Sequence, residues 1–96
     1  MGLGSYKFQV QRNRLLFLSM EPLLADPGEG FLNSLISWII IGAMTGPESK
    51  EKYPREPWIR RIVTEADRLQ IPIFMKDNLK PYWEGEWRQE FPDDKI

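Results

Sequence analysis

Three short apolar runs constrain the fold of this chain more than any other feature of its sequence. They are Leu15–Met20, Trp38–Ile41 and Ile73–Met75. The first shows no period-two alternation, and the second is β-branched and aromatic, so both are typical of strands that are covered on their two faces. Turn-forming residues follow each run, beginning with Pro22 after the first. The runs therefore predict three buried strands.

Helical patterns separate these runs. Residues 58–69 carry one apolar stripe at three- and four-residue spacing, which predicts an amphipathic helix that ends before Pro72. Pro54 and Pro57 suit the first turn of this helix. A shorter helix is predicted over Phe31–Ile36, where the apolar residues also have helical spacing. Strands that alternate with helices in this order indicate parallel strands joined by crossovers.

The two ends of the chain carry further patterns. Residues 6–13 fit either a helix or an added strand. Trp83, Trp87 and Phe91 are four residues apart, which predicts one amphipathic helical segment near the C-terminus. Because acidic residues surround these aromatics, they suit the covering of a core or a partner surface better than the stacking of nucleic-acid bases.

These elements predict an α/β fold in a single domain over residues 1–96. We expect a three-stranded parallel β-α-β-α-β unit, with residues 80–96 as an amphipathic C-terminal segment. The chain shows no internal repeat and no linker. A chain of 96 residues allows only a modest core, so a large cofactor would compete with that core for side chains.

The chain contains no cysteine and no histidine, which is the sharpest chemical fact in its sequence. Thiolate ligands for iron-sulfur clusters, cysteine nucleophiles, imidazole metal sites and histidine bases are therefore excluded. Acid–base chemistry would fall to carboxylates, Lys or Tyr, each of which needs a strongly shifted pKa to act near neutrality. We predict no catalytic residue and no metal site in this chain.

Charge and hydropathy bear on partners and location. The net charge is -1, with 13 basic and 14 acidic residues, so no long-range field favours nucleic acid. The longest apolar run, Leu35–Met44, falls short of the roughly 20 residues that span a bilayer. The N-terminus lacks a basic region that leads into an apolar core. We therefore expect a cytoplasmic protein without a nucleic-acid or membrane partner.

Polar and small residues follow all three predicted strands. Because the carboxyl ends of parallel strands meet at one edge of a sheet, we expect these residues to face one mouth. An ammonium group directly after a buried strand would bind a small ligand through an anionic or carbonyl group. The candidate ligand-binding residues are Ser19, Glu21, Thr45, Gly46, Lys76 and Asn78.

Simpler structural roles compete with ligand binding at these positions. Glu21 precedes a proline and suits a solvated turn, while Thr45 and Gly46 suit turn chemistry. Lys76 could pair with Glu21 in a salt bridge at the rim, which is worth only ~0–1 kcal/mol when exposed. The sequence leaves both interpretations open.

Three strings of residues together resemble a known family. They are Leu18–Leu24, Trp38–Gly42 followed by Thr45–Pro47, and Pro72–Leu79. In order and spacing they are similar to the C-terminal part of uncharacterised phage-associated proteins related to radical S-adenosylmethionine enzymes. The resemblance covers about Leu15 to Pro92.

The resemblance implies that the three strands are the last strands of a partial TIM-type barrel. It places Ser19, Glu21, Lys76 and Asn78 at the barrel mouth as ligand contacts. An iron-sulfur cluster and S-adenosylmethionine are implied only for a longer protein, because the cysteine motif of the family lies in an N-terminal part. Related chains often have an acidic residue after the second strand, where this one has Met44–Thr45.

Three function hypotheses follow. We expect a truncated or split C-terminal segment of a radical-SAM-like protein, which contributes ligand contacts but no catalysis alone. The alternatives are a free-standing interaction or structural domain and a small-molecule binder. Right-handed crossovers would place both helices on one face of the sheet, leaving the other face bare and both edges unpaired. Either the segment with Trp83, Trp87 and Phe91 folds back over the bare face, or another chain covers it. We favour another chain, and expect a homodimer or a separate N-terminal chain as partner.

Overall fold

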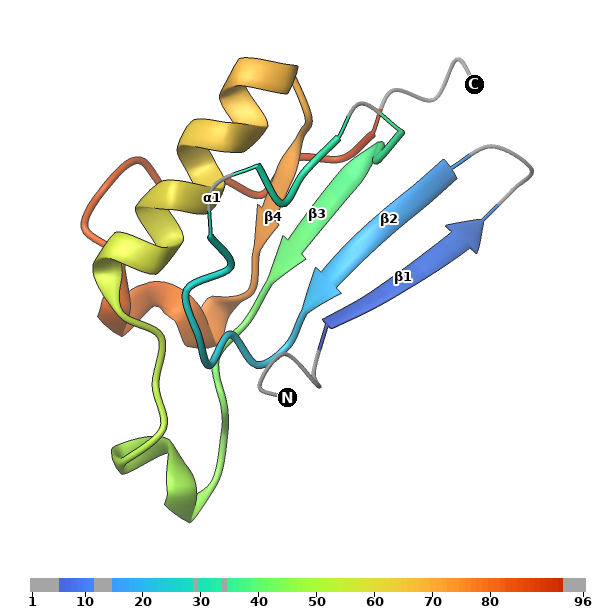
Figure 1. The fold of residues 1–96 in the computed structure, drawn as a ribbon. Helices are drawn as coiled ribbons and strands as arrows, with labels where there is room; N and C mark the ends of the chain where they lie inside the picture. The colour runs from blue at the N-terminus through green and yellow to red at the C-terminus, as the bar shows by residue number, and fades with distance from the viewer. Residues whose placement is uncertain (1–5, 12–14, 29, 34, 93–96) are drawn as a thin grey trace.

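The computed structural model describes residues 6–11, 15–28, 30–33 and 35–92 (Figure 1). These residues form a sheet, one α-helix and two short 3-10 helices. The elements are β1 (Tyr6–Gln11), β2 (Leu15–Met20), β3 (Trp38–Ile41), η1 (Pro47–Lys50), α1 (Glu56–Leu69), β4 (Ile73–Met75) and η2 (Asp77–Tyr82).

The sheet has the strand order β1-β2-β3-β4. Strands β2, β3 and β4 are parallel, with Phe17 opposite Trp38 and Ile40 opposite Phe74. This confirms an α/β fold with three parallel strands. Strand β1 is antiparallel to β2, so Tyr6–Gln11 is an added strand rather than a helix. Residues 12 and 13 lie outside the described part of the chain.

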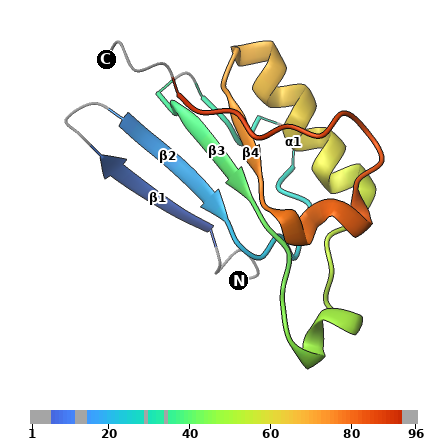
Figure 2. The same ribbon diagram turned by 180° about the vertical axis from the view of Figure 1, so that it is seen from behind.

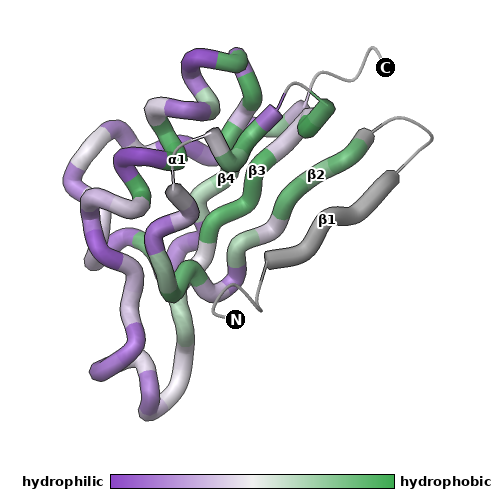
Figure 3. The backbone as a smooth tube through the Cα atoms, viewed as in Figure 1, coloured by the Kyte–Doolittle hydropathy of each residue, from purple (hydrophilic) through white to green (hydrophobic). Residues whose placement is uncertain are grey.

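Helix α1 confirms the predicted apolar stripe. It begins after Arg55 with a proline in its first turn, and it ends at Gln70, whose left-handed backbone (φ 59°) lets its N–H bond to the last turn. Ile59, Ile62 and Ala66 are fully buried against one face of the sheet. Apolar residues are concentrated in the strands, whereas the segment between β3 and α1 is largely hydrophilic (Figure 3).

The connection between β2 and β3 corrects one prediction. The described residues of 31–36 form a turn and irregular backbone, not a helix. Leu32 and Ile36 are buried as their spacing suggested, but Leu35 is 73% exposed and its N–H bonds to the Asn33 side chain. A local side-chain bond of this kind offers the backbone an alternative to helix formation. The predicted β-α-β-α-β order therefore has a loop in place of its first helix.

The C-terminal segment corrects a second prediction. After η2 the chain is extended, so Trp83, Trp87 and Phe91 do not lie on a helix. We call Trp83–Pro92 the C-terminal strap. It runs antiparallel along β4, where the Met75 N–H donates to the Arg88 carbonyl (2.8 Å). The backbone groups of an edge strand need partners, and the strap supplies them. The β4 edge is therefore not open, contrary to the sequence-based expectation.

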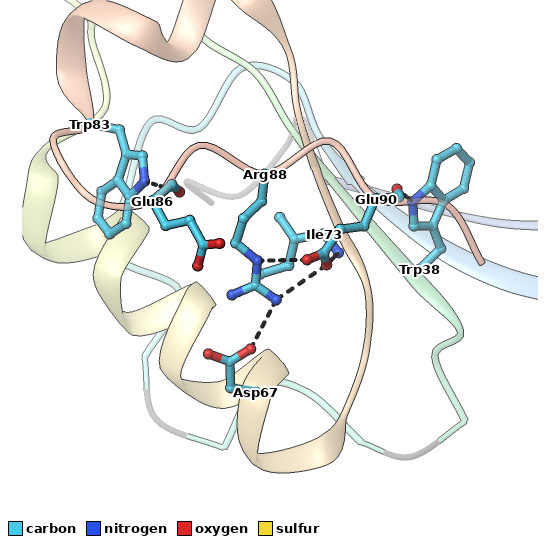
Figure 4. Close-up of polar contacts among 7 residues, drawn as sticks. All are labelled: Trp38, Asp67, Ile73, Trp83, Glu86, Arg88 and Glu90. Atoms are coloured by element: carbon cyan, nitrogen blue, oxygen red, sulfur yellow. Dashed lines mark hydrogen bonds and ion pairs between the residues drawn. The ribbon is translucent and has the colours of Figure 1, made fainter. Parts of the chain in front are cut away.

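Two local features mark the point where the strap begins. Pro81 lies inside η2, and a Cβ at Gly85 would clash with the Trp83 ring, which packs directly over that glycine. The Trp83 indole N–H donates to the Glu86 carbonyl (2.9 Å) across this tight turn (Figure 4). The turn redirects the chain toward β4.

Polar contacts fasten the strap to the rest of the molecule (Figure 4). The Arg88 guanidinium is 13% exposed and pairs with Asp67 on α1 (2.9 Å) and with Glu90 (3.0 Å). The Glu90 carboxylate also accepts a hydrogen bond from the Ile73 N–H (2.9 Å). The backbone carbonyl of Glu90 accepts a hydrogen bond from the Trp38 indole N–H (2.8 Å). The strap is thus tied to a helix and two strands.

Both α1 and the connection before β3 lie on one face of the sheet, as Figures 1 and 2 show. Along each parallel strand, every second residue is buried beneath α1 and the connection before β3. The residues between them point to the opposite face of the sheet, over which no described helix lies. We call this the helix-free face. It carries Phe17, Ser19, Trp38, Ile40 and Phe74.

The aromatic residues of the helix-free face pack against one another. Trp38 contacts Phe17 and Phe74 edge-on, with ring centroids 5.4 and 6.3 Å apart. Phe91 of the strap lies against Trp38 (5.8 Å) and Phe74 (5.4 Å) but remains 68% exposed. The strap therefore covers this face only in part.

Candidate functional site

Three polar side chains meet where the parallel strands end. Lys76 follows β4 and pairs with the Glu21 carboxylate, which follows β2, at 2.9 Å. The Ser19 hydroxyl donates to the other Glu21 oxygen at 2.6 Å. The predicted convergence of Glu21 and Lys76 on one mouth is confirmed. Lys76 remains 48% exposed, so its ammonium can still reach a ligand.

Gly42, at the end of β3, makes room for this ion pair. A Cβ there would lie 3.3 Å from the Glu21 Cγ and 3.4 Å from the Lys76 Cδ. The Gly42 N–H donates to Met20, and the Lys76 N–H donates to Ile41, which holds the three strand ends in register. The two charged side chains thus cross β3 directly above a residue without a side chain.

Asn78 has a structural role at the same edge. Its Oδ1 accepts from the Ala43 N–H and its Nδ2 donates to the Ala43 carbonyl, both at 2.9 Å. Both ends of the amide are therefore engaged by one backbone residue. This clamp ties η2 to the end of β3, and it positions the site rather than reaching toward a ligand.

An open pocket of about 370 Å³ lies at this edge. Its lining contains four of the six predicted residues, together with small and apolar neighbours that the sequence interpretation did not include. The lining residues are Glu21, Pro22, Gly42, Ala43, Met44, Thr45, Lys76 and Asn78. We call the group Ser19, Glu21, Gly42 and Lys76 the strand-end site.

The remaining predicted residues lie around the pocket. Ser19 is nearly buried behind Glu21, which it orients. Thr45 is exposed at the start of a projecting arm, Met44–Tyr53, which extends beyond the strand ends in Figure 1. Gly46 lies on that arm with φ 88°, and its carbonyl accepts from the Ser49 hydroxyl within η1. Gly46 thus has a turn role and does not line the pocket.

Gly42 is the site residue that sequence reasoning missed. The signal was present, because a glycine directly after a β-branched run often marks a close approach of neighbouring groups. The direction of that approach depended on which strands flank β3. Sequence order alone did not supply this information.

The chemistry of the strand-end site is that of an oriented cation. An ammonium has three donors, and Glu21 engages one side of it, so Lys76 can donate to a carboxylate, phosphate or carbonyl oxygen. Among the described residues no cluster of three or more His, Cys, Asp or Glu could hold a metal ion. The part of the chain that the structure describes also has no helix long and apolar enough to cross a membrane.

Comparison of the chain with models of protein families, with curated proteins and with solved structures found no match.

Proposed function

We propose that this chain forms one wall of a small-molecule binding site, as the last strands of a barrel related to radical S-adenosylmethionine enzymes would. It supplies ligand contacts and no catalysis of its own. The observation that carries this proposal is the Glu21–Lys76 ion pair, which spans three strand ends on the helix-free face.

The location of the pair supports a binding role. In parallel α/β barrels the inner face lies opposite the helices, and ligands bind at the carboxyl ends of the strands. Along the helix-free face, aromatic Phe17 and Trp38 precede Ile40, and the charged pair comes last. The helix-free face is therefore apolar along the strands and polar at the strand ends. A barrel whose interior is filled by apolar side chains, with a binding site at the carboxyl ends of its strands, has the same arrangement.

The ligand class follows from the lysine. The Ser19 and Glu21 contacts hold Lys76 in place, so less side-chain entropy is lost when it binds an anion or a carbonyl. Small anions such as phosphate or short carboxylates fit the pocket of about 370 Å³. An exposed ion pair contributes only ~0–1 kcal/mol to the stability of a folded protein. Stabilisation of the fold is therefore a weak explanation for the presence of the Glu21–Lys76 pair.

The cofactors of the related enzymes do not fit this chain by itself. An iron-sulfur cluster needs thiolate ligands, and the 96 residues contain no cysteine. Any such chemistry would require a separate N-terminal part that carries the cysteines. Within the proposal, this chain contributes the wall that binds the ligand.

Lys76→Ala tests the proposal. The protein is titrated with phosphate, acetate and pyruvate, and amide chemical shifts are recorded by NMR. We expect at least one of these anions to bind, and Lys76→Ala to lower its affinity about tenfold or more, since a charge-assisted hydrogen bond is lost. Lys50→Ala, on the exposed projecting arm, is the matched control and should bind normally. Equal affinity in Lys76→Ala would remove Lys76 from the site.

A second candidate function, an interaction domain, is favoured by the helix-free face. Its aromatic residues are only partly buried, and Phe91 remains largely exposed beside them. Apolar sheet faces are normally covered, so another polypeptide is a reasonable partner. The two functions use different ends of the same face.

A further inference from the structure

A second hollow adjoins the strand-end pocket. Its volume is about 360 Å³, and it shares Lys76 and Asn78 with the first. The other lining residues are Phe74, Asp77 and Gln89. Lys76 thus lies between two hollows, one over the ends of β2 and β3 and the other along β4.

The second hollow has a fixed aromatic wall. Phe74 points to the helix-free face, and its ring is held by Trp38 and by Phe91 (5.4 Å between the Phe74 and Phe91 centroids). A side-chain ring that already packs against other aromatic rings loses little conformational entropy when the ring of a ligand packs on it. The hollow therefore offers a prepared contact for a planar group.

The opposite side of the hollow is polar. The Gln89 side chain comes from the C-terminal strap and donates to the Met75 carbonyl (2.8 Å) and to the Asp77 carboxylate (3.2 Å). Each hollow therefore contains one carboxylate, Asp77 in this one and Glu21 in the first. Lys76 is the sole cation among the described residues that line the two hollows. The two hollows share the Lys76 ammonium, and what distinguishes the second is the aromatic ring of Phe74, which the first lacks.

We propose that the ligand of this site is an amphipathic small molecule in which a planar aromatic ring is joined to an anionic group. The anion binds Lys76, and the ring lies in the second hollow against Phe74. This inference rests on the proposed function, because it assumes that Lys76 binds an anion. It adds a specificity contact, Phe74, and a class of ligand.

Phenyl phosphate and methyl phosphate are the matched probes, because they carry the same anion with and without a ring. Both are titrated into the protein and followed by NMR. We expect phenyl phosphate to bind about tenfold more tightly, since ring–ring contact adds to apolar burial. Phenyl phosphate alone should shift the amide signals of Phe74 and Gln89.

Two variants locate the ring. In Phe74→Leu the tenfold preference should fall to about twofold, while the affinity for methyl phosphate stays unchanged. Phe17→Leu, on the same face but outside both hollows, should keep the full preference. Lys76→Ala should weaken the binding of both phosphates.

The outcomes separate the two proposals. If neither phosphate ester binds but phosphate, acetate or pyruvate does, only this inference is overturned; if none of these anions binds, the proposed function is wrong as well. If both bind with equal affinity, or if Phe74→Leu keeps the preference, only the inference is overturned. The comparison of the two phosphates uses the unaltered protein, so it decides the question even if Phe74→Leu fails to fold.

Discussion

Gly42 shows how a single residue controls the strand-end site. Its missing side chain lets Glu21 and Lys76 approach each other across β3, and a Cβ would lie 3.3–3.4 Å from both side chains. Its backbone is not in the left-handed region, so alanine is conformationally allowed. Position 42 can therefore change the site without changing the fold.

We predict that Gly42→Ala weakens anion binding severalfold while the free energy of unfolding changes by less than about 1 kcal/mol. The displaced ion pair explains the first effect. The free energy of unfolding changes little because two effects offset each other. The new Cβ makes a tight contact, but alanine loses less backbone entropy than glycine on folding, which is worth about 0.5–1 kcal/mol. Urea denaturation and NMR titration with phosphate measure the two quantities. Thr64→Ala, at an exposed position of α1 outside the pocket, is the control and should leave both unchanged.

At the scale of elements, the C-terminal strap depends on Glu90. Burial raises the pKa of this carboxyl, but hydrogen bonds from Arg88 and from the Ile73 N–H outweigh burial and hold the pKa below its usual value of 4.5. The hydrogen bond that Arg88 donates to Glu90 in turn raises the pKa of Arg88. Since the folded-state pKa of Glu90 is lowered, its contribution to stability is present above about pH 4.5 and is lost as the pH falls through the folded-state value.

We predict that Glu90→Gln flattens the fall in stability between pH 6 and pH 3. The variant should be less stable than the parent protein near pH 7, and the difference should shrink as the pH falls through the lowered folded-state pKa of Glu90. Urea denaturation across this pH range measures it. Glu84→Gln, an exposed carboxylate on the same strap, should retain the parent pH profile. If the stability of Glu90→Gln and that of the parent protein fell in parallel as the pH was lowered, this prediction would be wrong.

At the scale of the whole molecule, we expect the helix-free face to decide assembly. Parallel strands are normally covered on both sides, and the strap covers this face only at Phe91. One edge of the sheet is paired by the strap, and β1 lies at the other. A second copy packed face to face would bury Phe17, Trp38 and Phe91 with twofold symmetry.

We therefore predict a concentration-dependent dimer that Phe91→Lys shifts toward monomer. Phe91 is 68% exposed, so the lysine should cost little stability in the monomer while placing a charge in the interface. Leu35→Lys is the matched control, because Leu35 is 73% exposed on the connection that lies on the other face. Sedimentation velocity over a wide concentration range measures the association. A monodisperse monomer at high concentration would contradict this prediction and leave the covering role to the C-terminal strap.

What the sequence determined by itself was local or followed from periodicity. The three apolar runs became β2, β3 and β4, and the stripe at residues 58–69 became the buried side of α1. Because parallel strands place their carboxyl ends at one edge, the meeting of Glu21 and Lys76 could also be foreseen. Their role in binding stays a prediction.

Only the tertiary structure decided the features that depend on distant partners. Four-residue spacing in the strap suited a helix, but the unpaired backbone of β4 and the Arg88 contacts with Asp67 and Glu90 made the extended form favourable. The role of Gly42 likewise depended on which strands flank β3. In both cases the deciding groups are far apart in sequence, and their hydrogen bonds and charges outweigh a local pattern that is compatible with more than one conformation.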